Sequence, residues 1–197
     1  MDYIGQLYES YYPKMTPIFV AIGVVLTLFV YLVSCGFLCT VHMPHMHLRA
    51  FAFTAAALYY YLILMSTVFT RPEHSGMQYE LTPFWSYKLA FAGDTKLAKE
   101  IVLNMIMFIP MGFLITYVVD FLKRTYNKQV FGRMVLRLSL LIGIVCSAMI
   151  EILQLLLHRG LFEWDDIFDN TVGFLVGAAG YLLCSKCFEK KDCRGIV

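Results

Sequence analysis

Residues 135–157 read VLRLSLLIGIVCSAMIEILQLLL, and this stretch decides the fold. A helix needs about 20 mainly apolar residues to cross a bilayer, and the stretch is long enough. Glu151 and Gln154 interrupt it near its end. A carboxylate inside a membrane segment is costly unless it is paired or wetted, and such residues usually carry function. The stretch therefore predicts a membrane fold and marks a candidate site.

Composition supports a membrane protein over the whole chain. Of the 197 residues, 59% are hydrophobic and 15% are charged, and the mean hydropathy is +0.67. Soluble domains carry about 25% charged residues. A net charge of +2 is too small to indicate a nucleic-acid partner. We expect an all-α polytopic membrane helix bundle.

Five segments reach spanning length and form one predicted transmembrane domain over 17–188. They are residues 17–39, 48–69, 101–121, 135–157 and 168–188. Residues 1–16 place tyrosines on one helical face, which suits an interfacial helix or an aromatic belt before the first span. Residues 189–197 form a basic tail.

The distribution of Lys and Arg predicts the orientation. With five spans, ten basic residues fall on the side of the C-terminus and six on the side of the N-terminus. The positive-inside rule then puts the N-terminus outside and the C-terminus in the cytoplasm. The six cysteines form no disulfide framework, which suits packing roles in a reducing compartment.

Polar residues at helical spacing converge on the predicted outer face. Glu151, Gln154 and His158 share one face of the fourth span. Asp166, Asn170 and Gly173, spaced four and three residues apart, repeat this arrangement at the start of the fifth span. The remaining candidates are Arg71, Asn104, Arg159 and Asp165, with Pro110, Gly112 and Gly177 in structural roles.

These structural roles follow from backbone chemistry. Pro110 removes a backbone donor from the third span, so it kinks that helix or frees a carbonyl. Gly173 and Gly177 form a small-xxx-small pair that allows close helix approach.

Alternative interpretations remain open from the residues alone. Glu151 pairs with Arg71 or Arg159 and holds the bundle together, or it serves a ligand. Asp165 and Asp166 form an ordinary helix cap, since acidic residues suit a helix N-terminus, or they belong to the site.

The residue types favour an anionic, amphiphilic ligand. Arginine binds phosphate or carboxylate bidentately. Carboxylates at 151, 165 and 166 suit either Mg²⁺ binding or general-base chemistry. We expect no cofactor, with Mg²⁺ left as an alternative. A basic pair beside carboxylates at the lipid boundary suits an anionic headgroup on a lipid tail.

These spacings over residues 65–183 resemble the VanZ-like family, and the stretch Leu81 to Phe84 resembles its upstream signature. Glu80 departs from the family, in which asparagine is common at that position. Residues 160–164 also make the segment after Arg159 slightly longer than usual. The resemblance implies a bacterial plasma-membrane protein. The namesake of the family is associated with low-level resistance to teicoplanin, a lipid-tailed glycopeptide.

Three hypotheses follow. In the first, the outer site binds an envelope lipid, a lipid-linked wall precursor or a lipoglycopeptide, and contributes to glycopeptide resistance or envelope homeostasis. In the second, a membrane enzyme acts on a lipid-linked substrate with Glu151 or Asp166 as base or metal ligand. In the third, the protein is a structural partner or chaperone for another membrane protein. The oligomeric state does not follow from the sequence.

Overall fold

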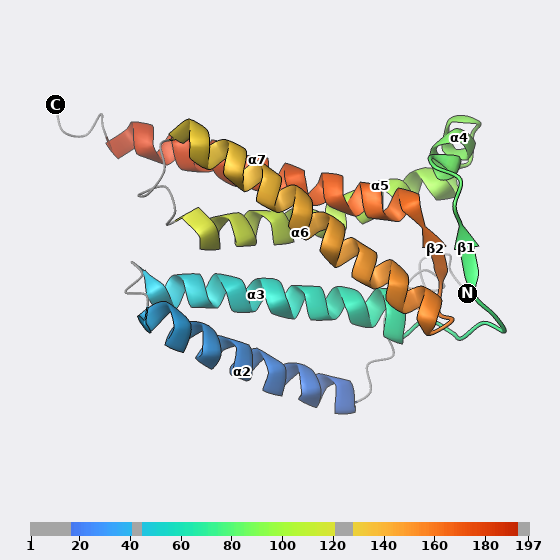
Figure 1. Cartoon of the computed structure of the whole chain (residues 1–197), viewed down its shortest axis with the longest axis horizontal. Helices are drawn as coiled ribbons and strands as arrows, with labels where there is room; N and C mark the ends of the chain where they lie inside the picture. The colour runs from blue at the N-terminus through green and yellow to red at the C-terminus, as the bar shows by residue number, and fades with distance from the viewer. Residues whose placement is uncertain (1–16, 41–44, 121–127, 193–197) are drawn as a thin grey trace, which may run out of the picture.

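The computed structural model describes residues 17–40, 45–120 and 128–192. Five helices run lengthwise through the molecule, and two short strands and a short helix gather at one end (Figure 1). The helices are α2 (Pro17–Thr40), α3 (Met46–Leu64), α4 (Trp85–Phe91), α5 (Thr95–Val119), α6 (Lys128–Leu156) and α7 (Trp164–Asp192). A π-helical turn, η1 (Met65–Phe69), extends α3, and the strands are β1 (Gln78–Glu80) and β2 (Leu161–Glu163).

The predicted membrane helix bundle is confirmed. Five helices of the described chain are long and apolar enough to cross a membrane, which makes this a multi-pass membrane protein. The predicted interfacial segment 1–16 lies outside the described residues, as does most of the predicted tail. The first residues of that tail, up to Asp192, continue α7.

Four helices begin earlier than the apolar windows predicted. α3 begins at Met46 rather than at 48 and α6 at Lys128 rather than at 135, and the other two are α5 and α7. α5 begins at Thr95 rather than at 101, because the Asp94 carboxylate accepts hydrogen bonds from the backbone N–H groups of Lys96 and Leu97 and caps the helix there. α7 begins at Trp164 rather than at 168. In both cases a polar first turn precedes the apolar run, and hydropathy alone does not detect such a turn.

α5 and α7 pack so closely that glycine is required at their contact. A Cβ on Gly173 would stand 1.9 Å from the Met105 carbonyl oxygen, and one on Gly177 would stand 2.0 Å from that of Ile109. From the other helix, a Cβ on Gly112 would stand 2.0 Å from the Phe174 carbonyl oxygen. Any side chain at these positions collides with backbone, so the glycines set the distance between the two helices.

The buried core lies beside this contact. Phe108 of α5 and Phe174 of α7 are fully buried, and Ile150 of α6 packs in the same cluster. α6 crosses α7 and brings its C-terminal half to η1 (Figure 1). Ala56 and Ile63 of α3 belong to the same cluster, so the core joins α3, α5, α6 and α7.

α2 lies at the edge of the bundle, against α3 (Figure 1). Tyr61 of α3 donates a hydrogen bond to the Phe19 carbonyl oxygen at 2.7 Å, and its ring lies over Gly23. Large apolar side chains such as Phe29 and Leu32 are more than 60% exposed. A helix with so much exposed apolar surface is suited to lipid on its remaining faces.

The segments predicted as loops at one end contain regular structure. β1 and β2 pair in parallel, with Tyr79 opposite Phe162 and Glu80 opposite Glu163. The predicted 158–167 loop therefore holds a strand and the first turn of α7, a correction to the sequence interpretation. We call this end of the bundle, with β1, β2, η1 and α4, the strand end (Figure 1).

Candidate functional site

All the predicted polar site residues lie at the strand end, on five different elements or their flanks. Arg71 follows η1 and Asn104 is on α5, while Arg159 lies between α6 and β2. The others are Glu151 and Gln154 on α6 and Asp165, Asp166 and Asn170 on α7. The fold thus gathers residues that are up to 99 positions apart in the chain (170 − 71).

Glu151 is buried with only one carboxylate oxygen satisfied. Its side chain is 1% exposed. Oε2 accepts a hydrogen bond from the Glu163 backbone N–H at 2.9 Å, whereas Oε1 has no hydrogen-bond partner among the described residues. An unsatisfied buried polar group is costly. Within the described ranges no cation lies within ion-pair distance of Glu151, so pairing with Arg71 or Arg159 does not account for its burial.

Asp166 connects the site to α5 and α6. Its Oδ1 accepts a hydrogen bond from Asn104 Nδ2 at 2.7 Å. Its backbone carbonyl accepts from Ser147 Oγ at 3.3 Å, and Ser147 Oγ in turn accepts from Asn170 Nδ2 at 2.8 Å. Neutral amides and hydroxyls therefore hold the start of α7 between its two neighbours.

Gln154 and Arg159 fasten the end of α6 to the end of α3. Gln154 Nε2 donates to the Thr67 carbonyl oxygen at 3.1 Å, and Arg159 Nη1 donates to that of Phe69 at 2.6 Å. A Cβ on Gly160 would stand only 2.9 Å from the Gln154 side chain, so glycine makes room for it. Both side chains thus bind backbone carbonyl groups of η1, and Arg159 does so through one guanidinium nitrogen.

Asp165 caps a different helix from the one on which it lies. Its oxygens accept hydrogen bonds from the N–H groups of Phe84 (2.6 Å) and Ser86 (3.0 Å) and from Ser86 Oγ (2.5 Å). These groups begin α4, so Asp165 satisfies the N-terminus of α4, a correction to its interpretation as a cap of its own helix. Tyr87 of α4 also donates a hydrogen bond to Asp169. Two aspartates of α7 therefore hold α4 in place.

Two adjoining cavities open between these elements. One, of about 360 Å³, is polar and has Trp85, Glu163 and Asp166 in its wall. The other, of about 610 Å³, has polar residues of η1 on one side and Tyr59, Ile106 and Met107 among its apolar lining. Both are also lined by Arg71, Lys96, Glu100, Leu103 and Asn104. We call the smaller cavity the chamber and the larger one, which has a mixed polar and apolar lining, the groove; the two meet at one shared boundary.

Glu163 is the titratable group of the chamber that lies outside the spans. Burial, followed by the nearby Asp166 carboxylate, raises its pKa to about 8, although the Trp85 indole N–H partly offsets the shift. Its backbone N–H is the group that binds Glu151. A carboxyl group with a pKa near neutrality is suited to proton transfer.

Three charged residues of the chamber were not among the sequence candidates: Lys96, Glu100 and Glu163. Lys96 and Glu100 form an exposed ion pair at 3.9 Å. The spacing of Lys96, Glu100 and Asn104, four residues apart, signals one shared helical face and was available in the sequence. Glu163 gave no comparable signal, because its place depends on a three-residue strand pairing with β1.

No group of three or more His, Cys, Asp or Glu side chains within the described ranges is arranged to hold a metal ion. The carboxylates at this end accept hydrogen bonds from amide, hydroxyl and backbone groups instead. The site as described is therefore a hydrogen-bonding and charge-bearing chamber.

The comparisons with known proteins agree with the extent of this architecture. A family model described as VanZ/LLP1 matches residues 51–185. This range covers α5, the whole of the strand end and nearly all of α3, and it leaves out α2. No curated protein and no solved structure matches the chain.

Proposed function

Since the chain belongs to the VanZ/LLP1 family, we propose that its strand end binds the anionic headgroup of an amphiphilic envelope ligand. The ligand is a lipid, a lipid-linked wall precursor or a lipoglycopeptide. Binding contributes to glycopeptide resistance or envelope homeostasis. The protein resides in the bacterial plasma membrane, with the strand end and N-terminus outside and the C-terminus in the cytoplasm.

The observation that carries this proposal is the boundary shared by the two cavities. Arg71 and Lys96 line both of them and supply positive charge for a phosphate or carboxylate. The larger cavity continues along Ile106 and Met107 of α5. Ile106 is 54% exposed, so this groove is accessible from the lipid side. A headgroup at Arg71 and a tail beside Ile106 match an amphiphile.

Different residues contribute to binding in different ways. Arg71 is exposed and faces both cavities, so it is the anchor for the anion. Asn104 and Asp166 offer hydrogen bonds to the sugar or amide groups of a headgroup. Arg159 and Gln154 act indirectly, because their hydrogen bonds hold η1 and thereby position the chain that leads to Arg71.

The test compares Arg71→Gln with Lys88→Gln, a matched loss of charge on α4 outside both cavities. Binding of teicoplanin, and of a form without its acyl tail, is measured on purified protein. Removing Arg71 should weaken teicoplanin binding roughly tenfold, since a charge-assisted hydrogen bond contributes about 1.5–3 kcal/mol. The tail-free form should bind more weakly to the wild type.

In cells, Arg71→Gln at normal protein levels should also change susceptibility to teicoplanin, whereas Lys88→Gln should not. Equal binding by both variants, or equal binding of the two teicoplanin forms, would remove the basis for an amphiphile site.

A second candidate function is enzymatic, and the Glu163 carboxyl group favours it. Its pKa of about 8 and its place in the chamber wall suit a general acid or base. Lipid-linked wall precursors are incubated with the wild type and with Glu163→Gln, with and without Mg²⁺. A modified product formed by the wild type alone would establish turnover. Binding without any product would support the binding function instead of the enzymatic one.

A further inference from the structure

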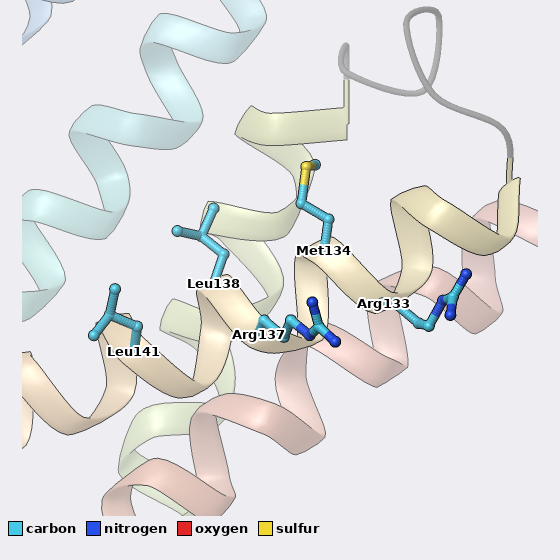
Figure 2. Close-up of a pocket in the computed structure, with 5 residues that line it drawn as sticks. All are labelled: Arg133, Met134, Arg137, Leu138 and Leu141. Atoms are coloured by element: carbon cyan, nitrogen blue, oxygen red, sulfur yellow. The ribbon is translucent and has the colours of Figure 1, made fainter.

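A further hollow lies on α6 at the end of the bundle away from the strands, and it combines positive charge with apolar surface. Its volume is about 530 Å³, and it is lined by Arg133, Met134, Arg137, Leu138 and Leu141. Figure 2 shows these five side chains along one stretch of α6, with Met134, Leu138 and Leu141 pointing to the same side. We propose that this groove binds an anionic phospholipid.

The two arginines are arranged for a phosphate. They are one helical turn apart, so their side chains emerge from the same face. Both are exposed, and neither guanidinium has an ion-pair partner among the described residues. Guanidinium groups bind phosphate oxygens bidentately. The phosphate of a lipid headgroup therefore binds between Arg133 and Arg137.

The apolar wall lies at the depth that an acyl chain requires. The apolar part of α6 that spans the membrane begins at Gly132, so Arg133 stands at the membrane boundary. Leu141 lies about 12 Å further along the axis, at about 1.5 Å per residue. An acyl chain continues from the phosphate along Leu138 and Leu141. An acidic protein segment would use the arginines but not this deeper wall.

Negative surface potential adds a general attraction for basic residues near a bilayer. The proposal is more specific than that attraction, because it places one lipid in one groove. It is also independent of the strand-end site, which lies at the far end of α6 (Figure 1).

Native mass spectrometry of the detergent-purified full chain tests the proposal, with phosphatidylglycerol and phosphatidylcholine titrated separately. The wild type should bind phosphatidylglycerol roughly tenfold more tightly. Arg133→Gln/Arg137→Gln should remove that preference. Lys186→Gln removes an exposed charge from α7 near the same end and should retain it.

Equal affinity of the wild type for the two lipids would overturn the proposal, and this comparison needs no variant. A preference that survives in the double variant, or that Lys186→Gln reduces as strongly, would also overturn it in favour of diffuse attraction. Glycerol 3-phosphate at the same concentration as the lipid should leave lipid binding unchanged, because it contacts the arginines but not the apolar wall. Displacement at equal concentration would overturn the proposal, because it would show that the acyl chain adds nothing to the affinity.

Discussion

Arg49 and Glu151 are charged residues buried at opposite ends of the bundle, and they differ in how the described structure satisfies them. At the end away from the strands, Arg49 is 5% exposed and donates to the carbonyl oxygens of Tyr117 and Val118, both at 2.8 Å. Its guanidinium also lies 5.3 Å from the centre of the Tyr117 ring. At the strand end, Glu151 is 1% exposed and has one oxygen without a donor.

Under the proposed function, this difference distinguishes a structural charge from a charge that serves a ligand. Arg49 holds the last turn of α5, whose carbonyl groups need donors. Glu151 accepts one backbone hydrogen bond, from Glu163 in the chamber wall, and its other oxygen is buried without a partner among the described residues. Under the proposed function, we expect capacity for a ligand or a proton at the strand end and a stabilising role for Arg49 at the other end.

The largest expected loss of stability comes from disrupting the contact between α5 and α7, which connects the two ends of the bundle. Gly173→Leu should destabilise the protein by about 3 kcal/mol or more, because its Cβ would stand 1.9 Å from the Met105 carbonyl oxygen. Gly180→Leu on the same helix is the control, since nothing lies within 4 Å of its Cβ position. Unfolding in mixed micelles measures both variants. Similar unfolding of the two would show that α5 and α7 tolerate separation.

Removal of the satisfied charge should have the next largest effect. Arg49→Met takes the donor from the Tyr117 and Val118 carbonyl oxygens. The expected loss of stability is about 2–3 kcal/mol, the cost of leaving such groups buried without partners. Lys186→Met, which replaces an exposed cation of α7, should change stability by less than about 0.5 kcal/mol. If Arg49→Met leaves the free energy of unfolding unchanged, the contrast between the two ends is removed.

At the strand end, stability should depend on pH through Glu163. Its pKa rises from 4.5 to about 8 on folding, so the folded state holds a proton that the unfolded state releases. Stability is therefore highest below about pH 4.5 and falls as the pH rises to about 8. The loss should be about 1–2 kcal/mol, because partial exposure screens the group. Thermal unfolding across this range measures it, and Glu163→Gln should flatten the profile.

The smallest expected change in stability comes from neutralising the unsatisfied charge. Glu151→Gln keeps an acceptor for the Glu163 N–H, so unfolding should change by no more than about 1 kcal/mol. If Glu151→Gln unfolds as readily as Arg49→Met, then the Glu151 carboxylate is structural and the comparison of the two ends fails.

Much of the fold was predictable because hydropathy is a local property. Each of the five spans follows from its own run of apolar residues. The predicted start at residue 101 was late, because the turns that begin α5 at Thr95 are polar and depend on the Asp94 cap. The pairing of β1 with β2 was not predictable, since two three-residue strands carry no periodic signal.

The sequence predicted which site residues share a helix face, but it did not predict which groups they contact. Spacings of three and four residues indicated that Glu151 shares a face with Gln154, and Asp166 with Asn170. They did not indicate that Asp165 would cap α4, whose first N–H group is 81 residues away along the chain. The same spacing rule, applied to Lys96 and Glu100, would have found two further residues of the chamber wall.

The sequence by itself determined that this is a bundle of membrane helices with polar residues concentrated at one end. A membrane segment is selected by its summed transfer free energy, which needs no knowledge of neighbours. Only the tertiary structure decided which polar groups are satisfied and which are not. Hydrogen-bond satisfaction depends on partners from distant segments, such as Thr67 for Gln154 and Asn104 for Asp166. The unpartnered oxygen of Glu151 is a product of that packing.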